Sequence, residues 1–178
     1  MRNNSLIIAV VATFNLFGQP QAFKSNTSAT FEVGNMIFNT VRGSIEGAQG
    51  RAIFEDGLLT AISGSLDIST LKSGNRTRDG HLKEKEEFFN IVKTPRIYFK
   101  ASEVVFVGKT NGNTTYKLSG SLNLRGVSNE IVLEFKETSK KHLVGTFTVN
   151  RDLWGLGEGW SNAMISQDID VQVDIYLE

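Results

Sequence analysis

Hydrophobic and polar residues alternate along most of the chain after Ala29, which is the pattern of β-strands with one dry and one wet face. The last strand shows it best. From Ile165 to Leu177 every second residue is apolar, and only Gln167 interrupts the row. Turn signals rich in glycine, asparagine and lysine separate the other rows. The pattern predicts strands near residues 29–41, 46–55, 58–70, 96–107, 114–124, 130–138, 142–150 and 163–177.

Eight long strands joined by hairpin turns favour either an up-and-down barrel or a sandwich. We prefer the barrel, because full closure removes the exposed strand edges that a sandwich would leave. The expected fold class is therefore all-β, an eight-stranded antiparallel barrel. Its strand at 58–70 is predicted to present Leu58 and Ile62 on its apolar face. Mid-strand Gly64, Gly120 and Gly145 allow tight coiling or leave room beside a ligand.

One stretch, residues 75–89, departs from the strand pattern. Asn75 and Asp79 are residues that cap helices, and the mixed charges at 83–87 are typical of one or two exposed helical turns. Phe88 supplies an apolar anchor, and Pro95 returns the chain to a strand. We expect a short helical insertion that covers one end of the barrel.

The 178 residues suit a single domain with a sizeable core. Nineteen basic and nineteen acidic side chains cancel, and the chain has no basic run, so nucleic acid is not an expected partner. Cysteine is absent from the sequence, which excludes disulfides and a lipid anchor on cysteine.

The first 22 residues have the pattern of an export signal. Arg2 gives a basic start, residues 6–17 are apolar, and residues 18–22 offer a cleavage segment. A buried first strand is the alternative, but this apolar run does not alternate. We therefore expect a signal peptide at 1–22 and a soluble domain at 23–178 that is periplasmic or secreted. No other stretch reaches the roughly 20 apolar residues of a membrane span, so stable membrane insertion is not expected.

The helical stretch and its surroundings resemble the YceI-like family. Matches to the motifs N-x-x-R-D-x-H-L, F-F and P-x-I-x-F are Asn75, Arg78, His81, Leu82, Phe88, Phe89, Pro95 and Phe99, and further matches lie at 40–43, 122–128 and 151–156. Gly80 and Arg96 depart from the family pattern. The resemblance spans roughly residues 28–178 and implies a lipocalin-like barrel that binds a polyisoprenoid-type lipid.

Catalytic and metal-binding patterns are weak. His81 and His142 are the only histidines, which leaves almost no ligands for a metal site. Residues 159–163 approach the turn that carries a catalytic serine but lack its final glycine. We assign no catalytic residue, no metal and no cofactor other than a bound lipid.

Twelve phenylalanines are available to line the lumen of a barrel. Arg78 and His81 are candidates for head-group contact, with Arg42 or Arg125 assisting. The alternatives are that Arg78 pairs with Asp79 or Glu84, that His81 ties the helix to a strand carbonyl, and that Trp154 packs the barrel end. The candidate ligand-binding residues are Phe38, Phe54, Arg78, His81, Phe88, Phe99, Phe135, Phe147 and Trp154.

The leading hypothesis is an exported protein that binds a polyisoprenoid, a quinone tail or a fatty-acid-like lipid for transport, storage or sequestration. A long chain gains about 0.8 kcal/mol for each buried CH2 group, so a dry lumen suffices for binding. Two alternatives stay open. One is an interaction protein with a filled barrel, including a homodimer. The other is an enzyme that uses His81 as its acid or base.

Overall fold

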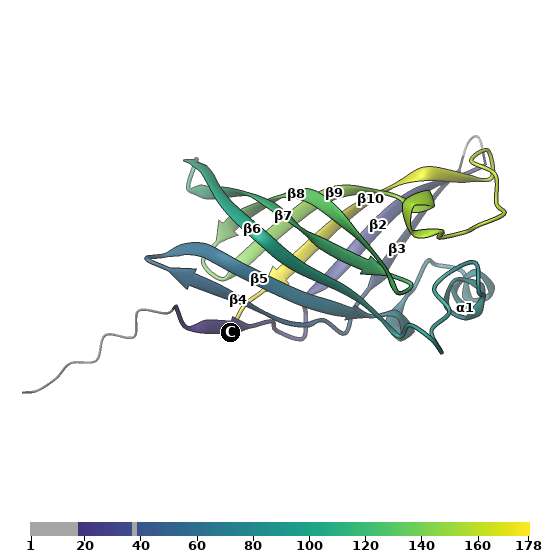
Figure 1. The fold of residues 1–178 in the computed structure, drawn as a ribbon, viewed down its shortest axis with the longest axis horizontal. Helices are drawn as coiled ribbons and strands as arrows, with labels where there is room; N and C mark the ends of the chain where they lie inside the picture. Colours follow the sequence, from purple (N-terminus) through teal and green to yellow (C-terminus); the bar gives the residue numbers. More distant parts are fainter. Residues whose placement is uncertain (1–17, 37–38) are drawn as a thin grey trace, which may run out of the picture.

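The computed structural model describes residues 18–36 and 39–178, which form one curled antiparallel sheet with a short helix at one end (Figure 1). The strand order across the sheet is β1-β4-β5-β6-β7-β8-β9-β10-β2-β3. Two 3-10 turns, Ile68–Thr70 and Arg151–Trp154, follow β5 and β9. The strands are β1 (Pro20–Ala22), β2 (Ser28–Asn35), β3 (Asn39–Ile45), β4 (Gln49–Glu55), β5 (Leu58–Asp67), β6 (Arg96–Thr110), β7 (Asn113–Leu124), β8 (Val127–Ser139), β9 (His142–Asn150) and β10 (Ile165–Tyr176).

The antiparallel β-fold is confirmed, but the expected count of eight strands in a closed barrel is wrong. The segment predicted as one strand at 29–41 is a hairpin, β2 and β3, and short β1 adds a further strand. The apolar residues at 36–38 look like strand in the sequence, which hid the turn. In the part of the chain that the structure describes, edge strands β1 and β3 share no ladder, so the sheet is a half-barrel.

Two isolated β-bridges connect the two edges of this half-barrel to other segments of the chain. One joins Phe23 to Leu177 beyond the end of β10, and the other joins Ser44 on β3 to Lys72 after the first 3-10 turn. The sheet therefore encloses an interior without a continuous ring of strands.

The predicted helical insertion is present as α1 (Arg76–Glu84). Asn75 caps it, because its side-chain oxygen accepts a hydrogen bond from the backbone N–H of Arg78 at 3.0 Å. After the helix the chain turns inward, and Phe88 and Phe89 pack against Ile68. Figure 1 shows α1 beside the ends of the strands, so the helix covers one end of the sheet.

Two β-bulges change which residues face inward. The pairing of β10 with β2 shifts between Ile165 and Ile169, and this turns Gln167 outward, where its amide nitrogen donates to Asp152 at 3.0 Å. Another shift, between β4 and β5, leaves Leu58 40% exposed and puts Leu59 in the core at 3%. The prediction that Leu58 and Ile62 share one apolar face is therefore wrong, because a sequence pattern of period two does not reveal the bulge.

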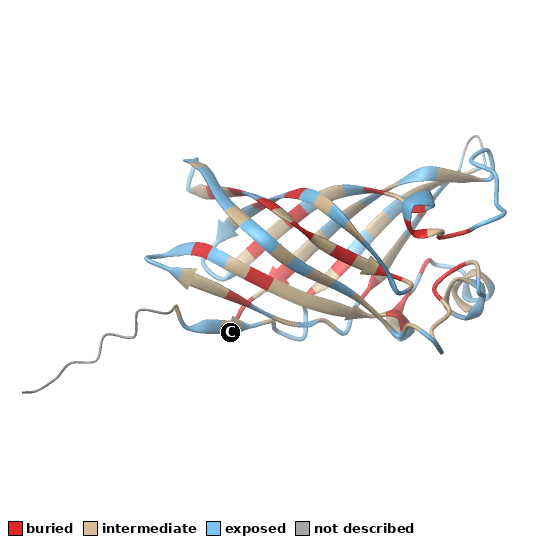
Figure 2. Ribbon diagram, viewed as in Figure 1, coloured by how far each residue is buried: buried red, intermediate tan, exposed pale blue. Residues whose placement is uncertain are grey.

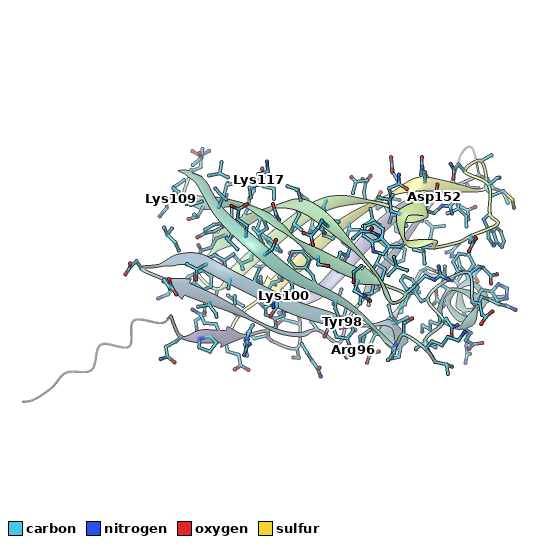
Figure 3. The ribbon with its side chains drawn as sticks, in the orientation of Figure 1. Arg96, Tyr98, Lys100, Lys109, Lys117 and Asp152 are labelled. Atoms are coloured by element: carbon cyan, nitrogen blue, oxygen red, sulfur yellow. The ribbon has the colours of Figure 1, made fainter. Side chains whose placement is uncertain are left out.

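The interior has a solid end and a hollow end. At the end away from α1, which we call the solid end, apolar side chains pack together inside the sheet, and Figure 2 shows buried segments in red along the strands there. The tip of the β6–β7 hairpin at Lys109 marks this end in Figure 3, and Asp152 marks the opposite end. The side chains that fill the solid end are Ala52, Leu59, Tyr116, Leu118, Leu143 and Leu177.

Among the described residues, no helix is long and apolar enough to cross a membrane.

Candidate functional site

A cavity of about 230 Å³ lies inside the curled sheet, between the solid end and α1. Strands β2, β3 and β5–β10 contribute inward side chains to its wall, and Leu82, Phe88 and Phe89 close it on the side of the helix. Nearly all of these side chains are apolar, and Arg78 and Arg151 are the charged residues among them. The cavity is therefore suited to an apolar ligand with its polar part near α1.

Some residues of the wall are more exposed than those that fill the solid end. Phe147 and Val171 point inward from β9 and β10 but are only half-buried, because part of each side chain faces the cavity while the rest packs against the core. On β6, Phe99 lines the cavity while its neighbours Tyr98 and Lys100 lie on the outer face (Figure 3). The alternation read from the sequence thus produces both the wall of the cavity and the outer surface of the molecule.

Phenylalanine rings fill the space above the mid-strand glycines. A Cβ atom on Gly145 would lie 2.5 Å from the ring of Phe135, its cross-strand partner, and one on Gly64 would lie 2.5 Å from the ring of Phe23. These glycines therefore let aromatic rings lie flat against the sheet. The room that they provide is occupied by rings of the wall and adds nothing to the empty volume.

Arg78 is the charged group of α1 that reaches the cavity. Its Nε donates to the hydroxyl of Ser73 at 2.8 Å and its Nη2 to the carbonyl of Ser73, while Ser73 in turn donates its backbone N–H to Asp79 at 2.7 Å. Ser73 therefore links the arginine to Asp79, in place of a direct ion pair. Nη1 has no hydrogen-bond partner in residues 18–36 and 39–178, so it is available to a ligand.

Arg151 also borders the cavity, but all of its nitrogens are engaged. It is buried, and it donates to backbone carbonyls of the loop 155–165, including Leu156 at 3.0 Å, Gly157 at 3.1 Å and Trp160 at 2.8 Å. Its positive charge is thus satisfied by the loop that it holds in place. The family resemblance includes the motif at 151–156 but could not assign this role to Arg151, because most of its acceptors are main-chain atoms.

The two other arginines considered for the head group lie elsewhere. Arg125 donates to the carbonyls of Trp154, Gly155 and Glu86, and so ties the second 3-10 turn to the segment after α1. Arg42 is exposed and forms an ion pair with Glu32 at 2.7 Å. Both arginines therefore have structural partners away from the ligand space.

The candidate ligand-binding residues separate into three groups. Phe54, His81 and Trp154 lie off the cavity wall: Phe54 packs against the solid end, His81 is exposed on α1, and Trp154 donates its indole N–H to the carbonyl of Leu122 at 3.0 Å, so it packs the barrel end. Phe38 lies outside the described residues. The candidates that the structure brings together on the wall are Arg78, Phe88, Phe99, Phe135 and Phe147.

Several residues of the wall were not among the candidates. Ile169 and Val171 of β10 and Val33 of β2 line the cavity together with the phenylalanines. Their alternation was visible, but a sequence pattern does not say which face of a strand points inward. Within the described residues no three histidine, cysteine or carboxylate side chains gather as a metal site would require.

A family model described as a YceI-like domain matches residues 21–177. UPF0312 proteins of Yersinia pestis (strain Pestoides F) and Yersinia enterocolitica (serotype O:8) are each 30% identical to this chain over 112 residues. The match covers 62% of the chain and 55% of those proteins, so it spans about half of the length of these relatives.

Solved structures have the same fold at low sequence identity. BcnA of Burkholderia cenocepacia superposes with a TM-score of 0.72 at 13% identity, covering 83% of this chain and 94% of that one. The YceI protein of Campylobacter jejuni gives 0.71 at 20% identity, with coverage of 82% and 89%. A polyisoprenoid-binding domain from Saccharophagus degradans, implicated in plant cell wall breakdown, gives 0.69 at 13% identity, with coverage of 90% and 98%.

Proposed function

The chain belongs to the YceI-like family, and we propose that it binds one long apolar lipid, of the polyisoprenoid class, in the cavity of its curled sheet. The polyisoprenoid-binding domain of Saccharophagus degradans, which has the same fold, supports this ligand class. A quinone tail or a fatty-acid-like chain fits the same physical argument, because each presents a long run of apolar carbon.

The observation that carries the proposal is the apolar wall of the cavity. Inward side chains such as Phe147, Ile169 and Val171 stay partly accessible inside a folded domain of this size. A lipid chain placed there would bury both its own surface and theirs, at about 0.8 kcal/mol for each CH2 group. Such binding needs no charged contact along the chain.

We place the polar end of the ligand beside Arg78. Among the residues that the structure describes, the Nη1 of this guanidinium has no hydrogen-bond partner, whereas the nitrogens of Arg151 are bound to the loop. A hydroxyl, carbonyl or phosphate of the head group would accept from it. The proposed role is therefore binding for transport, storage or sequestration, without a chemical step. His81, the residue of the enzymatic alternative, is exposed and does not line this cavity.

The experiment is native mass spectrometry of the protein purified from its own host, followed by organic extraction and identification of the lipid. We expect one isoprenoid per chain. Val171→Trp, which fills the cavity, should abolish the bound mass, while Val132→Trp on the outer face of β8 should retain it. Circular dichroism checks that both variants fold. A wild-type protein that is empty, and stays empty after incubation with prenyl lipids, contradicts the proposal.

A second candidate, contact between two copies of the chain, is favoured by the free edge of β6. The β5–β6 ladder ends at Ser63 and Lys100, and within residues 18–36 and 39–178 the rest of β6, to Thr110, pairs only with β7. Val105, Phe106 and Val107 are exposed on this part of the strand. Light scattering after size exclusion would reveal a dimer, and Val105→Lys should convert it to a monomer. A wild-type monomer at all concentrations contradicts this candidate.

We further propose that the protein is exported and that the signal is cut ahead of Pro20. The apolar residues 6–17 support export. The position of the cut is supported by β1, because Gln21 pairs with Ala52 of β4 and a cut after Ala22 would remove this strand. The intact mass of the protein recovered outside the cytoplasm tests both points. A mature chain that starts at Phe23 contradicts the proposed cut.

A further inference from the structure

Three large apolar side chains are exposed together at the α1 end of the molecule. Met36 is 60% exposed, Trp160 41% and Met164 41%, and we call these three the mouth patch. Met36 follows β2, whereas Trp160 and Met164 belong to the loop that precedes β10. The backbone N–H of Met36 donates to the carbonyl of Met164 at 3.0 Å, so the two segments lie side by side, as Figure 1 shows for the upper right of the molecule.

The loop that carries the mouth patch is held in a defined position. Arg151 donates to the carbonyl of Trp160 at 2.8 Å and to the side chain of Asn162 at 2.8 Å, and the N–H of Met164 bonds to the carbonyl of Ser161 at 2.9 Å. A buried arginine thus fixes a loop whose large side chains are left in solvent. Their exposure is a property of the fold, since hydrogen bonds hold the backbone of Trp160 and Met164 in place.

The mouth patch is continuous with the cavity. The rings of Trp160 and Phe88 are 6.0 Å apart between their centroids, and Phe88 lines the cavity. An apolar path therefore runs from the exposed patch across these two rings to the interior. The exposed residues Val105, Phe106 and Val107 of β6 lie at the solid end, away from the cavity.

We propose that the mouth patch docks onto the surface of a phospholipid bilayer and lets the lipid pass between the bilayer and the cavity. The inference rests on the proposed lipid-binding function. A long apolar ligand resides in bilayers, and tryptophan settles at the interface between membrane and water. The segment 75–93 at this end carries five basic and four acidic side chains. Its net charge is therefore close to zero, and it attracts anionic lipid only weakly. Docking is apolar, and salt changes it little.

The two tryptophans make the docking directly measurable. Trp154 is 2% exposed and hydrogen-bonded inside the protein, so Trp160 reports any contact with lipid. Vesicles of phosphatidylcholine should shift the emission of the wild-type protein to shorter wavelength, and brominated phosphatidylcholine should quench it. The shift should be lost in Trp160→Phe.

Co-flotation with the same vesicles measures binding independently. Trp160→Ser should lower the bound fraction about tenfold, and Met164→Ser should lower it by a smaller factor. Tyr98→Ser is the matched control, because Tyr98 is an exposed aromatic on the outer face of β6, away from the mouth patch. This variant should float like the wild type.

Four results would overturn docking. These are the absence of both the shift and flotation, an equal loss in Tyr98→Ser, a loss of binding in 0.5 M salt, and binding only to vesicles that contain membrane proteins. The last would identify a protein partner. Uptake of a short prenyl lipid from detergent solution, without vesicles, tests the cavity separately. Uptake without flotation leaves the proposed function standing and removes only the docking.

Discussion

The solid and hollow ends of the sheet are built from the same alternating strands, and their difference lies in what crosses the interior. At the solid end, Tyr116 extends from β7 across the interior, and its hydroxyl accepts a hydrogen bond from the backbone N–H of Leu59 on β5 at 3.3 Å. At the hollow end, half-buried side chains such as Phe147 and Val171 face a cavity instead. Stability is therefore expected to concentrate at one end and ligand binding at the other.

The largest expected contrast comes from two leucine truncations. Leu118→Ala at the solid end should lower the free energy of unfolding by about 3–5 kcal/mol, because it leaves a void among fully buried neighbours. Leu66→Ala in the cavity wall should cost only about 1–2 kcal/mol, because Leu66 is already half-accessible. Urea unfolding of both variants without lipid provides the comparison. Equal costs would contradict the distinction between the ends.

A smaller loss is expected from Tyr116→Phe. This change leaves the N–H of Leu59 without its acceptor, and the cost should be about 1–3 kcal/mol at neutral pH. Burial raises the pKa of Tyr116 in the folded state. Its contribution to stability is therefore complete below the unfolded pKa, about 10, and is lost as the pH rises through the folded pKa.

Denaturant melts of the wild type and Tyr116→Phe between pH 8 and 11 test this pH dependence. The difference in unfolding free energy between the two should shrink above about pH 10. A difference that is constant over this range would show that the hydroxyl is not buried in the manner described. Lipid retention should be the same in both proteins, because Tyr116 lies outside the cavity wall.

Arg78→Gln sharpens the comparison from the hollow end. Loss of the guanidinium that faces the ligand should weaken lipid retention about tenfold, which is the value of one hydrogen bond from a charged donor. Arg76→Gln is the control, since Arg76 is exposed on the same helix. The two variants are compared in competition for a fluorescent prenyl lipid. Equal losses would assign the effect to the overall charge of α1.

The smallest effect is expected at Gly80 on α1. A Cβ atom at this position meets no other atom within 4 Å, so Gly80→Ala should raise the unfolding free energy by about 0.5–1 kcal/mol through better helix propensity. Gly145→Ala is the counterpart in the sheet and should destabilise, because its Cβ would collide with the ring of Phe135. Thermal melts show whether each variant is more or less stable than the wild type. A destabilised Gly80→Ala would contradict the open surroundings of that residue.

The strands and the helix were predictable because their signals are local. Period-two alternation located most of the strands, and the cap at Asn75 located the helix. The turn between β2 and β3 was missed because it is apolar, and the exchange of Leu58 for Leu59 was missed because a bulge leaves no trace in the alternation.

The site was predictable only in part. The phenylalanines of the wall follow from alternation together with the family resemblance, but alternation is the same at the solid and hollow ends and cannot say where the cavity lies. The roles of Arg125 and Arg151 depend on backbone carbonyls of other segments, which no side-chain pattern reports.

Photo-crosslinking tests most directly whether the hollow end holds the lipid. A prenyl lipid with a diazirine along its chain is bound, irradiated and mapped by peptide mass spectrometry. We predict crosslinks to wall residues such as Phe147, Ile169 and Val171, and none to Leu118 or Leu143 of the solid end. Crosslinks confined to the outer face of the sheet, or spread equally over both ends, would contradict the account.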